Sequence, residues 1–328
     1  MDSSPGPATG ATRAWALLVA LAAIWGSSFL FIKLALVSVP PLTIAASRIA
    51  LGALLLLAVL RAKGGRLPPP GPHWVPIALA AALGSVVPFS LIGYGERTID
   101  SALAAMLMAT VPLFTVLVAH LVTDDEKLGA RKLAGVAIGF AGTVLLAGPG
   151  ALAELGAAAL AQAMVAGAAL CYALSSIVSR RLSGLERLPV ASAILALASA
   201  MIVPFSLVLD RPWTLAPGAV ELAAIAVLGL GATATAQLIL LEVIALRGAS
   251  FLSLNNYLVP VFGVVWGVAL LGEAPGPDAL AAFGLILLGV VIAQGGARRG
   301  VRAPAGPVLD ERPRVDAGGA GDETGPER

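Results

Sequence analysis

Two apolar segments that lie about half a chain apart share one layout. The segment Ser250–Glu273 contains Pro260 and the segment Ser101–Glu126 contains Pro112, so the prolines are 148 residues apart (260 − 112 = 148). A valine precedes each proline, and each segment ends in acidic residues. Each segment is also long enough to cross a bilayer as a helix. A layout that recurs at a fixed interval indicates a repeat, so the chain is predicted to consist of two similar halves.

The composition predicts a polytopic membrane protein that lies in a lipid bilayer. Hydrophobic residues make up 58% of the chain and charged residues only 12%, whereas a soluble domain carries about 25% charged residues. The net charge of +2 and the short, scattered basic clusters give no indication of nucleic-acid binding. Cys171 is the single cysteine, and His73 and His120 match no metal-binding spacing, so no metal site and no cofactor are expected.

Ten helices are predicted from apolar runs that approach the roughly 20 residues needed to span the hydrocarbon layer. Their approximate ranges are 14–36, 41–60, 74–94, 98–121, 129–148, 157–179, 189–209, 217–241, 248–271 and 278–296. The predicted fold class is therefore an all-α polytopic membrane protein. The polar segments 1–13 and 297–328 lack an apolar period and are predicted to be disordered tails.

The repeat includes the first helix of each half. The matching pairs, 147 or 148 residues apart, are Trp25–Tyr172, Ser28–Ser175, Lys33–Arg180 and Pro41–Pro189. The two halves are then residues 14–148 and 157–296, with five helices each. An odd number of crossings makes the second half enter the membrane from the opposite face, which gives a 5+5 inverted repeat. This architecture is common in secondary transporters, and duplication without transport is the alternative.

Basic residues are concentrated in every second connection between the predicted helices. They occur near 61–66, 127–132, 180–187 and 247 and again after 297, whereas the other connections carry only Arg97 and Arg211. Cytoplasmic connections retain such an excess of Lys and Arg, so both termini are predicted to be cytoplasmic. The high content of Ala, Gly and Pro indicates a GC-rich bacterial genome and hence a bacterial inner membrane.

Several helices resemble those of the EamA-type branch of the drug/metabolite transporter superfamily. The similar stretches are AIWGSSFLFIKLAL, Pro40–Pro41 followed by Arg48, LAGVAIGFAGTVLLAG, ALRGASFLSLNNYLVPVFGVVWGVALLGE and LAAFGLILLGVVIAQG. Together they cover nearly all of residues 14–296, although the first repeat ends in VTDDE where Gly-Glu is usual. The resemblance implies ten helices, cytoplasmic termini and movement of small metabolites such as amino acids, often outward. It does not fix the solute.

Polar side chains within the predicted helices are candidates for a solute site, because an unpaired amide or charge in hydrocarbon costs several kcal/mol. The sharpest signal is the adjacent pair Asn255 and Asn256. Arg48 is a candidate partner for a substrate carboxylate, with pairing to a helix end or an acidic side chain as the alternative. The predicted substrate-binding residues are Trp25, Ser28, Arg48, Tyr172, Gln237, Asn255, Asn256 and Tyr257. For the small and aromatic members, helix packing is the alternative role.

Other residues receive structural or mechanical predictions. Pro112 and Pro260 each remove one backbone hydrogen bond and are predicted to be hinges or static kinks. Lys33 and Arg180 occupy corresponding repeat positions near membrane ends and are predicted to extend to the surface as anchors. Gly135 and Gly139 are predicted to mediate helix packing.

Carboxylates that could carry protons through the membrane are scarce. Glu96, Glu221, Glu242 and Glu273 fall near ends of predicted helices, and none lies clearly at the midplane. This distribution favours a facilitator, or coupling through something other than a buried acid.

The sequence therefore predicts a secondary transporter, and more narrowly an exporter, in which helices 1–4 and 6–9 rock around a small molecule held near the midplane. The alternatives are a lipid-binding or regulatory membrane protein and an intramembrane hydrolase. The hydrolase is disfavoured because Ser27, Ser28 and His120 form no catalytic motif, and the chain has neither H-E-x-x-H nor a P-loop. The protein is accordingly predicted not to be an enzyme. The sequence leaves the solute, the coupling ion and the oligomeric state open.

Overall fold

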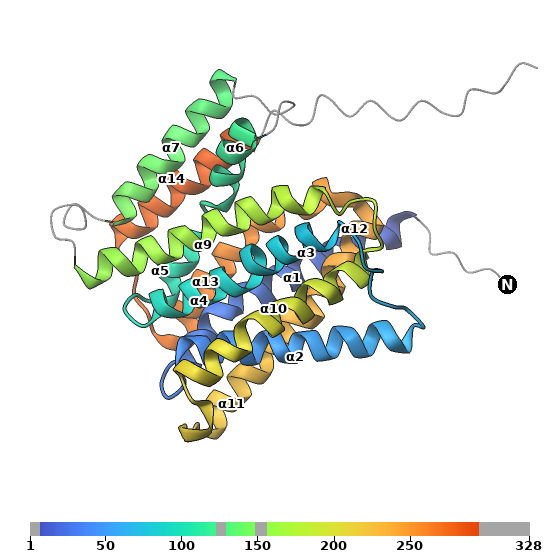
Figure 1. Ribbon diagram of the computed structural model, residues 1–328. Coiled ribbons are helices and arrows are strands. Elements are labelled where there is room, and N and C mark those ends of the chain that lie inside the picture. The colour runs from blue at the N-terminus through green and yellow to red at the C-terminus, as the bar shows by residue number, and fades with distance from the viewer. Residues whose placement is uncertain (1–6, 123–128, 148–155, 295–328) are drawn as a thin grey trace, which may run out of the picture. The chain divides into compact units, whose positions relative to one another are not determined.

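The computed structural model describes residues 7–122, 129–147 and 156–294, in which every regular element is a helix (Figure 1). The first half contains α1 (Pro7–Ala35), α2 (Pro41–Ala62), α3 (Trp74–Ala81), η1 (Ala82–Val86), α4 (Val87–Glu96), α5 (Ser101–Met108), α6 (Val111–Val122) and α7 (Ala130–Ala147). The second half contains α9 (Ala157–Arg180), α10 (Arg187–Leu209), η2 (Pro212–Thr214), α11 (Ala219–Ala226), η3 (Val227–Thr235), α12 (Ala236–Leu252), α13 (Asn255–Leu271) and α14 (Pro277–Gln294).

Apart from the short 3-10 turn η2, these elements form ten helices in the described residues, in the order predicted from the sequence. The third helix consists of α3, η1 and α4, the fourth of α5 and α6, and the eighth of α11, η3 and α12. Eight helices are long and apolar enough to cross a membrane, and α13 is a shorter apolar helix of 17 residues. The predicted all-α polytopic fold is confirmed.

The first helix begins earlier than predicted. α1 starts at Pro7 rather than at Ala14, because the fixed φ of proline suits the first position of a helix and the small residues that follow do not interrupt it. The rest of the predicted N-terminal tail, residues 1–6, and the predicted C-terminal tail lie outside the described residues.

The third and eighth helices each contain a π-helical segment, η1 and η3, at corresponding places in the two halves. Pro88 follows η1 within two residues, and its missing N–H disturbs the regular hydrogen-bond ladder at this place. In η3, a Cβ atom at Gly229 would lie 2.6 Å from the Cβ atom of Leu51, so α2 and η3 approach closely. The sequence patterns did not predict these segments, which are frequent at functional sites.

The first helices of the two halves run in opposite directions, as an inverted repeat requires. Lys33 near the end of α1 bonds to the carbonyl of Glu96 at the end of α4, so α1 and α4 end on the same side. Gly95, also at the end of α4, lies against Ala161 and Val165 in the first third of α9. α9 therefore begins where α1 ends.

The two predicted hinge prolines have different settings. Pro112 is the second residue of α6 and follows a break between α5 and α6, at which the backbone N–H of Leu113 donates to the carbonyl of Thr110 at 2.9 Å. Pro260 lies inside the continuous helix α13. In the second half the break comes before the helix that contains Pro260, between α12 and α13, and Gly248 within α12 has the left-handed φ of 79°. Whether either place acts as a hinge stays a prediction.

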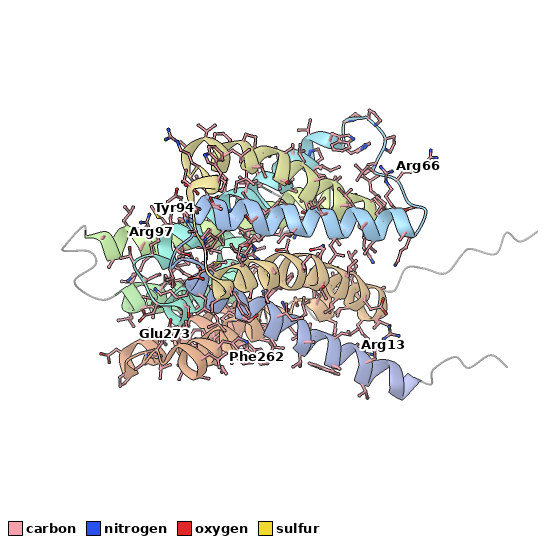
Figure 2. The ribbon with its side chains drawn as sticks, turned by 90° about the horizontal axis from the view of Figure 1, so that it is seen from below. Arg13, Arg66, Tyr94, Arg97, Phe262 and Glu273 are labelled. Carbon is pink, nitrogen blue, oxygen red and sulfur yellow. The ribbon has the colours of Figure 1, made fainter. Side chains whose placement is uncertain are left out.

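The helices have two chemically different ends, and Figure 2 shows Arg13 and Arg66 at one and Arg97 and Glu273 at the other. We call the first the basic end, and its residues include Arg13, Arg61, Arg66, Arg180 and Arg247. We call the second the acidic end, and its residues include Glu96, Asp100, Asp210, Glu221, Glu273 and Asp278.

The fifth and tenth helices, α7 and α14, lie side by side (Figure 1). Gly289 of α14 lies directly against the backbone of Gly135 and Gly139, and Gly142 lies against Ala282 and Ile286. Such contacts leave no room for side chains and allow two helix backbones to approach closely. The predicted packing role of Gly135 and Gly139 is therefore confirmed.

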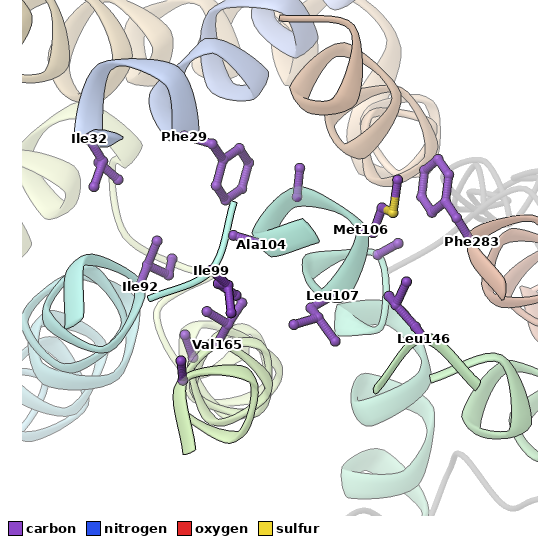
Figure 3. Packing of buried hydrophobic residues seen from close by; sticks show 14 of the residues in the cluster. Phe29, Ile32, Ile92, Ile99, Ala104, Met106, Leu107, Leu146, Val165 and Phe283 are labelled. Atoms are coloured by element: carbon purple, nitrogen blue, oxygen red, sulfur yellow. The ribbon is translucent and has the colours of Figure 1, made fainter. Parts of the chain in front are cut away.

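Buried apolar side chains from both halves form one main core. Figure 3 shows Phe29 and Ile32 of α1 near Ile92 of α4 and Ala104 of α5, with Phe283 of α14 at the far side of the cluster. All of them belong to the compact unit of residues 1–295. The core therefore fixes α1, α4 and α5 relative to one another and forms one wall of the cavity described next.

Candidate functional site

A cavity of about 310 Å³ lies between the two halves. Both π-helical segments and both prolines singled out in the sequence contribute to its wall. Its lining residues are Trp25, Ser28, Phe29, Ile32, Arg48, Gly84, Ser85, Phe89, Ile92, Met108, Val111, Pro112, Tyr172, Leu195, Ala232, Thr233, Gln237, Asn255, Asn256, Val259 and Pro260. The wall is mostly apolar, with a few polar side chains from helices far apart in the sequence.

Seven of the eight predicted binding residues line this cavity: Trp25, Ser28, Arg48, Tyr172, Gln237, Asn255 and Asn256. The exception is Tyr257, whose hydroxyl donates a hydrogen bond of 2.8 Å to Oε1 of Gln294 in α14. Successive residues of a helix point about 100° apart, so the residue that follows Asn256 points away from the cavity. The structure therefore gives Tyr257 a packing role between α13 and α14 in place of the predicted binding role.

Arg48 supplies the positive charge in the cavity wall. Its residue is only 4% exposed, and its Nε donates to Oγ1 of Thr233 at 3.3 Å. The guanidinium carbon lies 3.9 Å from the centre of the Phe89 ring, within the range of a cation–π contact. In the described residues this is the one hydrogen bond that the guanidinium makes, so its remaining N–H groups are available to an acceptor in the cavity.

The two asparagines differ in burial. Asn255 is 2% exposed, and its Oδ1 has no hydrogen-bond partner in the part of the chain that the structure describes. Asn256 is exposed. A buried amide without a partner is costly, so Asn255 at the start of α13 is a second polar group that a bound molecule would satisfy.

Trp25 connects the cavity wall to the π-helical segment η3. Its indole Nε1 donates to the carbonyl of Ala232 at 3.0 Å, so the ring is held in place while it lines the cavity. The indole Nε1 of Trp266 in α13 donates to the carbonyl of Ala23 in α1 and joins these two helices. Both contacts fix α1 against the second half.

A second cavity of about 200 Å³ continues from the first toward the basic end. The two cavities share Gly84, Ser85, Leu195 and Gln237. The second one adds the hydroxyl groups of Ser175 and Ser179, and Ser179 is the last residue but one of α9. A polar passage therefore extends from the main cavity to the end of α9.

At the acidic end, buried polar contacts join the helices. Nζ of Lys33 donates to the carbonyls of Glu96 and Ile99 at 2.9 and 2.7 Å, so this amine binds the end of α4 rather than extending to the surface as predicted. The carboxylate of Glu273 accepts hydrogen bonds from the backbone N–H groups of Ser101 and Ala102 at 2.9 and 2.7 Å. Two N–H groups at a helix start, which have no partner within the helix, are a favourable site for a carboxylate.

A further contact joins α2 and α10 at the acidic end. The backbone N–H and the hydroxyl of Thr43 donate to Oδ2 of Asp210 at 2.8 and 2.9 Å. The same hydroxyl lies 3.0 Å from Oγ of Ser206. The first and second halves are thus connected at this end.

Sequence reasoning missed two kinds of residue at or near the site. Ser85 and Thr233 of the π-helical segments and Phe89 of α4 line the cavity, and no sequence pattern marked them. Glu96 was placed near a helix end and given no role, but the structure buries it completely. The sequence feature that could have drawn attention to Glu96 is Lys33, because a lysine at the end of a membrane helix needs hydrogen-bond acceptors nearby.

Among the described residues, no group of three or more His, Cys, Asp or Glu side chains is placed to hold a metal ion. The cavity wall offers groups that can bind a solute: the cation of Arg48, the amides of Gln237, Asn255 and Asn256, hydroxyl groups and aromatic rings around a mostly apolar space. Such a wall suits a small molecule with an anionic group and an apolar or aromatic part.

A family model described as the EamA-like transporter family matches the chain twice, over residues 13–148 and 159–294. The chain is 30% identical over 282 residues to an uncharacterized inner membrane transporter, YedA, of Escherichia coli K12, covering 84% of this chain and 88% of the relative. It is 26% identical over 276 residues to an S-adenosylmethionine/S-adenosylhomocysteine transporter of Chlamydia trachomatis serovar L2, covering 81% and 84%.

A solved crystal structure has the same fold. Its TM-score with this chain is 0.61 at 22% sequence identity, and the match covers 88% of this chain and 99% of the other. At this level of identity the likeness extends to the fold and not to the solute.

Proposed function

The chain belongs to the EamA-like transporter family, and we propose that it is a secondary transporter that exports a small metabolite with a carboxylate, such as an amino acid, from a bacterial cell. Family membership makes the chain a multi-pass membrane transporter rather than an enzyme. We propose three further points: the solute class, the outward direction of transport and a location in the bacterial inner membrane. The main observation in support of the solute class is the cavity that contains Arg48.

The charge and size of the cavity support a small anionic group as the part that is recognised. The guanidinium of Arg48 is buried in the wall and has N–H groups free of protein acceptors in the described residues. A guanidinium binds carboxylates in a planar, two-point geometry. The cavity volume of about 310 Å³ is near the lower end of the range for small-molecule sites, which suits an amino acid or a molecule somewhat larger.

One relative supports the same class of solute. The Chlamydia trachomatis transporter is named for S-adenosylmethionine and S-adenosylhomocysteine, and both of these molecules contain an amino-acid carboxylate. They also contain an aromatic base, for which Trp25, Tyr172 and Phe89 in the cavity wall offer stacking partners. We include molecules of this kind among the solutes to be tested.

The mechanism that we propose is alternating access around this cavity. Helices 1–4 and 6–9 rock relative to each other, and α7 and α14 support the outside of the bundle. The excess of Arg and Lys at the basic end supports a cytoplasmic location for that end. In this orientation the second cavity, lined by Ser175 and Ser179, faces the cytoplasm. The acidic end then opens to the outside to release the solute.

Flux measurements in proteoliposomes test the proposal. The vesicles are loaded with a labelled amino-acid mixture or with S-adenosylmethionine, and Arg48→Gln is compared with the wild type. We expect Arg48→Gln to lower the flux of the transported solute about tenfold, since a hydrogen bond to a charged group contributes about 1.5–3 kcal/mol and a factor of ten is about 1.4 kcal/mol.

The matched control is Arg97→Gln, which removes an exposed arginine outside the cavity and is expected to leave the flux within about twofold of wild type. Absence of wild-type flux for every solute tested would contradict the proposed solute class. Flux that Arg48→Gln leaves unchanged would contradict the recognition of a carboxylate by Arg48.

A further inference from the structure

Glu96 is a completely buried carboxyl group at the end of α4, with an exposed fraction of 0%. Neither of its two carboxyl oxygens has a hydrogen-bond partner in the part of the chain that the structure describes. Buried polar atoms in native structures are almost always paired, so such an exception requires an explanation. The hydroxyl of Ser101, also completely buried, is a further polar atom without a partner at the same end.

The charged groups around Glu96 come from three elements. Lys33 of α1 directs its amine to the backbone carbonyls of Glu96 and Ile99 and forms no ion pair with the Glu96 carboxyl group. Arg48 of α2 and Glu273 after α13 are the other charged side chains that act on it. α5 carries no charged residue, and the titratable side chains of α9 are those of Cys171, Tyr172 and, at its far end, Arg180.

The amine of Lys33 finds its hydrogen-bond acceptors in backbone carbonyls, so it does not need the Glu96 carboxyl group as a partner. Carbonyls at the end of a helix carry partial negative charge and favour a cation, and here they hold the amine of Lys33. An ionised carboxylate beside it would be buried with both oxygens unpaired, which costs far more than burying a neutral polar group. A proton on Glu96 removes that cost.

We propose that Glu96 is a proton-binding site of this transporter, occupied while the acidic end is closed and emptied when that end opens to water. Opening brings water to the carboxyl group, which passes its proton to that water and becomes a solvated carboxylate. Closing reverses the step, because the carboxylate takes a proton from water before it is buried again. The assignment rests on the proposed transport function, since it makes opening of the acidic end depend on pH.

The position of Glu96 links the proton to the solute site. Ile92, one helical turn before Glu96, and Ile32, next to Lys33, both line the main cavity. The contact of Glu273 with α5 and the contact of Lys33 with α4 lie beside the buried carboxyl group. The same movement that opens the cavity toward the acidic end therefore uncovers Glu96, and proton binding favours the closed arrangement.

Thiol labelling at the acidic end tests the proposal without any solute. Ser101→Cys is introduced into a Cys171→Ser chain in liposomes, and its reaction with a membrane-impermeant maleimide is followed at several pH values. The reference is Asp278→Cys, a cysteine at an exposed position of the same end. Its labelling rate gives the intrinsic pH dependence of the maleimide reaction, by which the rates of Ser101→Cys are corrected. After this correction we expect labelling of Ser101→Cys to become several-fold faster as the pH rises.

The decisive variant is Glu96→Gln, which imitates the protonated carboxyl group. Added to Ser101→Cys, it is expected to give slow labelling at every pH, whereas the control Asp278→Asn leaves the pH dependence intact. The proposal is overturned if labelling of the parent is independent of pH, or if Glu96→Gln leaves the dependence unchanged.

Thermal unfolding of the same variants in detergent gives a second, independent test. If Glu96 carries a proton in the closed protein, Glu96→Gln folds with a Tm at neutral pH equal to or above that of the parent. A clear loss of Tm on Glu96→Gln would show that the folded chain depends on an ionised carboxylate there, which contradicts the proposal. Because neither test uses a solute, a failed flux experiment leaves both results interpretable.

Discussion

The acidic and basic ends of the helices are held together by different kinds of contact. At the acidic end, buried or half-buried hydrogen bonds connect the two halves, from Thr43 to Asp210 and from α5 to Glu273. At the basic end, the halves are joined by exposed contacts. One is an ion pair of 2.8 Å between Arg13 and Glu242, whose side chains are 61% and 42% exposed, and another is a hydrogen bond of 3.2 Å from Nε of Arg131 to the carbonyl of Ile292.

The difference indicates which end opens more easily. Hydrogen bonds to a charged group contribute about 1.5–3 kcal/mol, whereas an exposed ion pair contributes about 0–1 kcal/mol and is screened by salt. The second cavity also extends toward the basic end. The comparison supports a conformation that is closed at the acidic end, and in the proposed cycle the contacts of Glu273 and Asp210 have to break.

The largest effect is expected from Glu273→Ala. This change removes the acceptor for two backbone N–H groups at the start of α5, so we expect a loss of about 3 kcal/mol of unfolding free energy from bonds to a charged group and an acidic end that opens more often. Thermal unfolding and thiol labelling of the acidic end measure the two effects. Glu273→Gln keeps one acceptor and is expected to lose about half as much unfolding free energy. If wild type and Glu273→Ala were equally stable, the proposed difference between the two ends would be contradicted.

A smaller effect is expected from Asp210→Asn. The amide oxygen still accepts from Thr43, but the charge that strengthens both bonds is lost. We expect a loss of about 1 kcal/mol in unfolding free energy. Asp278→Asn, an exposed carboxylate at the same end, is the matched control and is expected to have no measurable effect. Equal losses in both variants would mean that net charge at this end matters rather than the contact with Thr43.

The smallest effect is expected at the basic end, from Glu242→Gln. Because the pair with Arg13 is exposed, its removal is expected to change the unfolding free energy by less than about 0.5 kcal/mol, and high salt should abolish even this difference. A loss as large as that of Glu273→Ala would contradict the comparison and make the basic end the more firmly closed one.

The sequence predicted the number of helices and most of the polar residues in the cavity wall for a common physical reason. Long apolar runs are costly anywhere but in lipid or a core, and polar residues within them, such as Arg48 and Asn255, have to face a cavity or a neighbouring helix. The same reasoning placed Tyr257 in the site, because periodicity alone did not show that its hydroxyl reaches Gln294.

The remaining features depend on contacts that a sequence does not reveal. At Gly52 and Gly229, α2 and the π-helical segment η3 approach each other closely, and no sequence pattern marked this contact. Glu96 is near a helix end in the sequence, yet the structure buries it completely. Burial of a residue at a helix end is decided by what packs over that end, which local pattern does not encode.

The most direct measurement is transport with the acidic end locked. The hydroxyl oxygens of Thr43 and Ser206 are 3.0 Å apart, so Thr43→Cys with Ser206→Cys in a Cys171→Ser chain brings two thiols close enough for a disulfide across the halves. Alternating access requires that oxidation abolish flux in proteoliposomes and that reduction restore it, with Thr43→Cys alone unaffected by oxidant. Full flux through the oxidised protein, with the disulfide verified, would contradict opening of the acidic end as a step of transport.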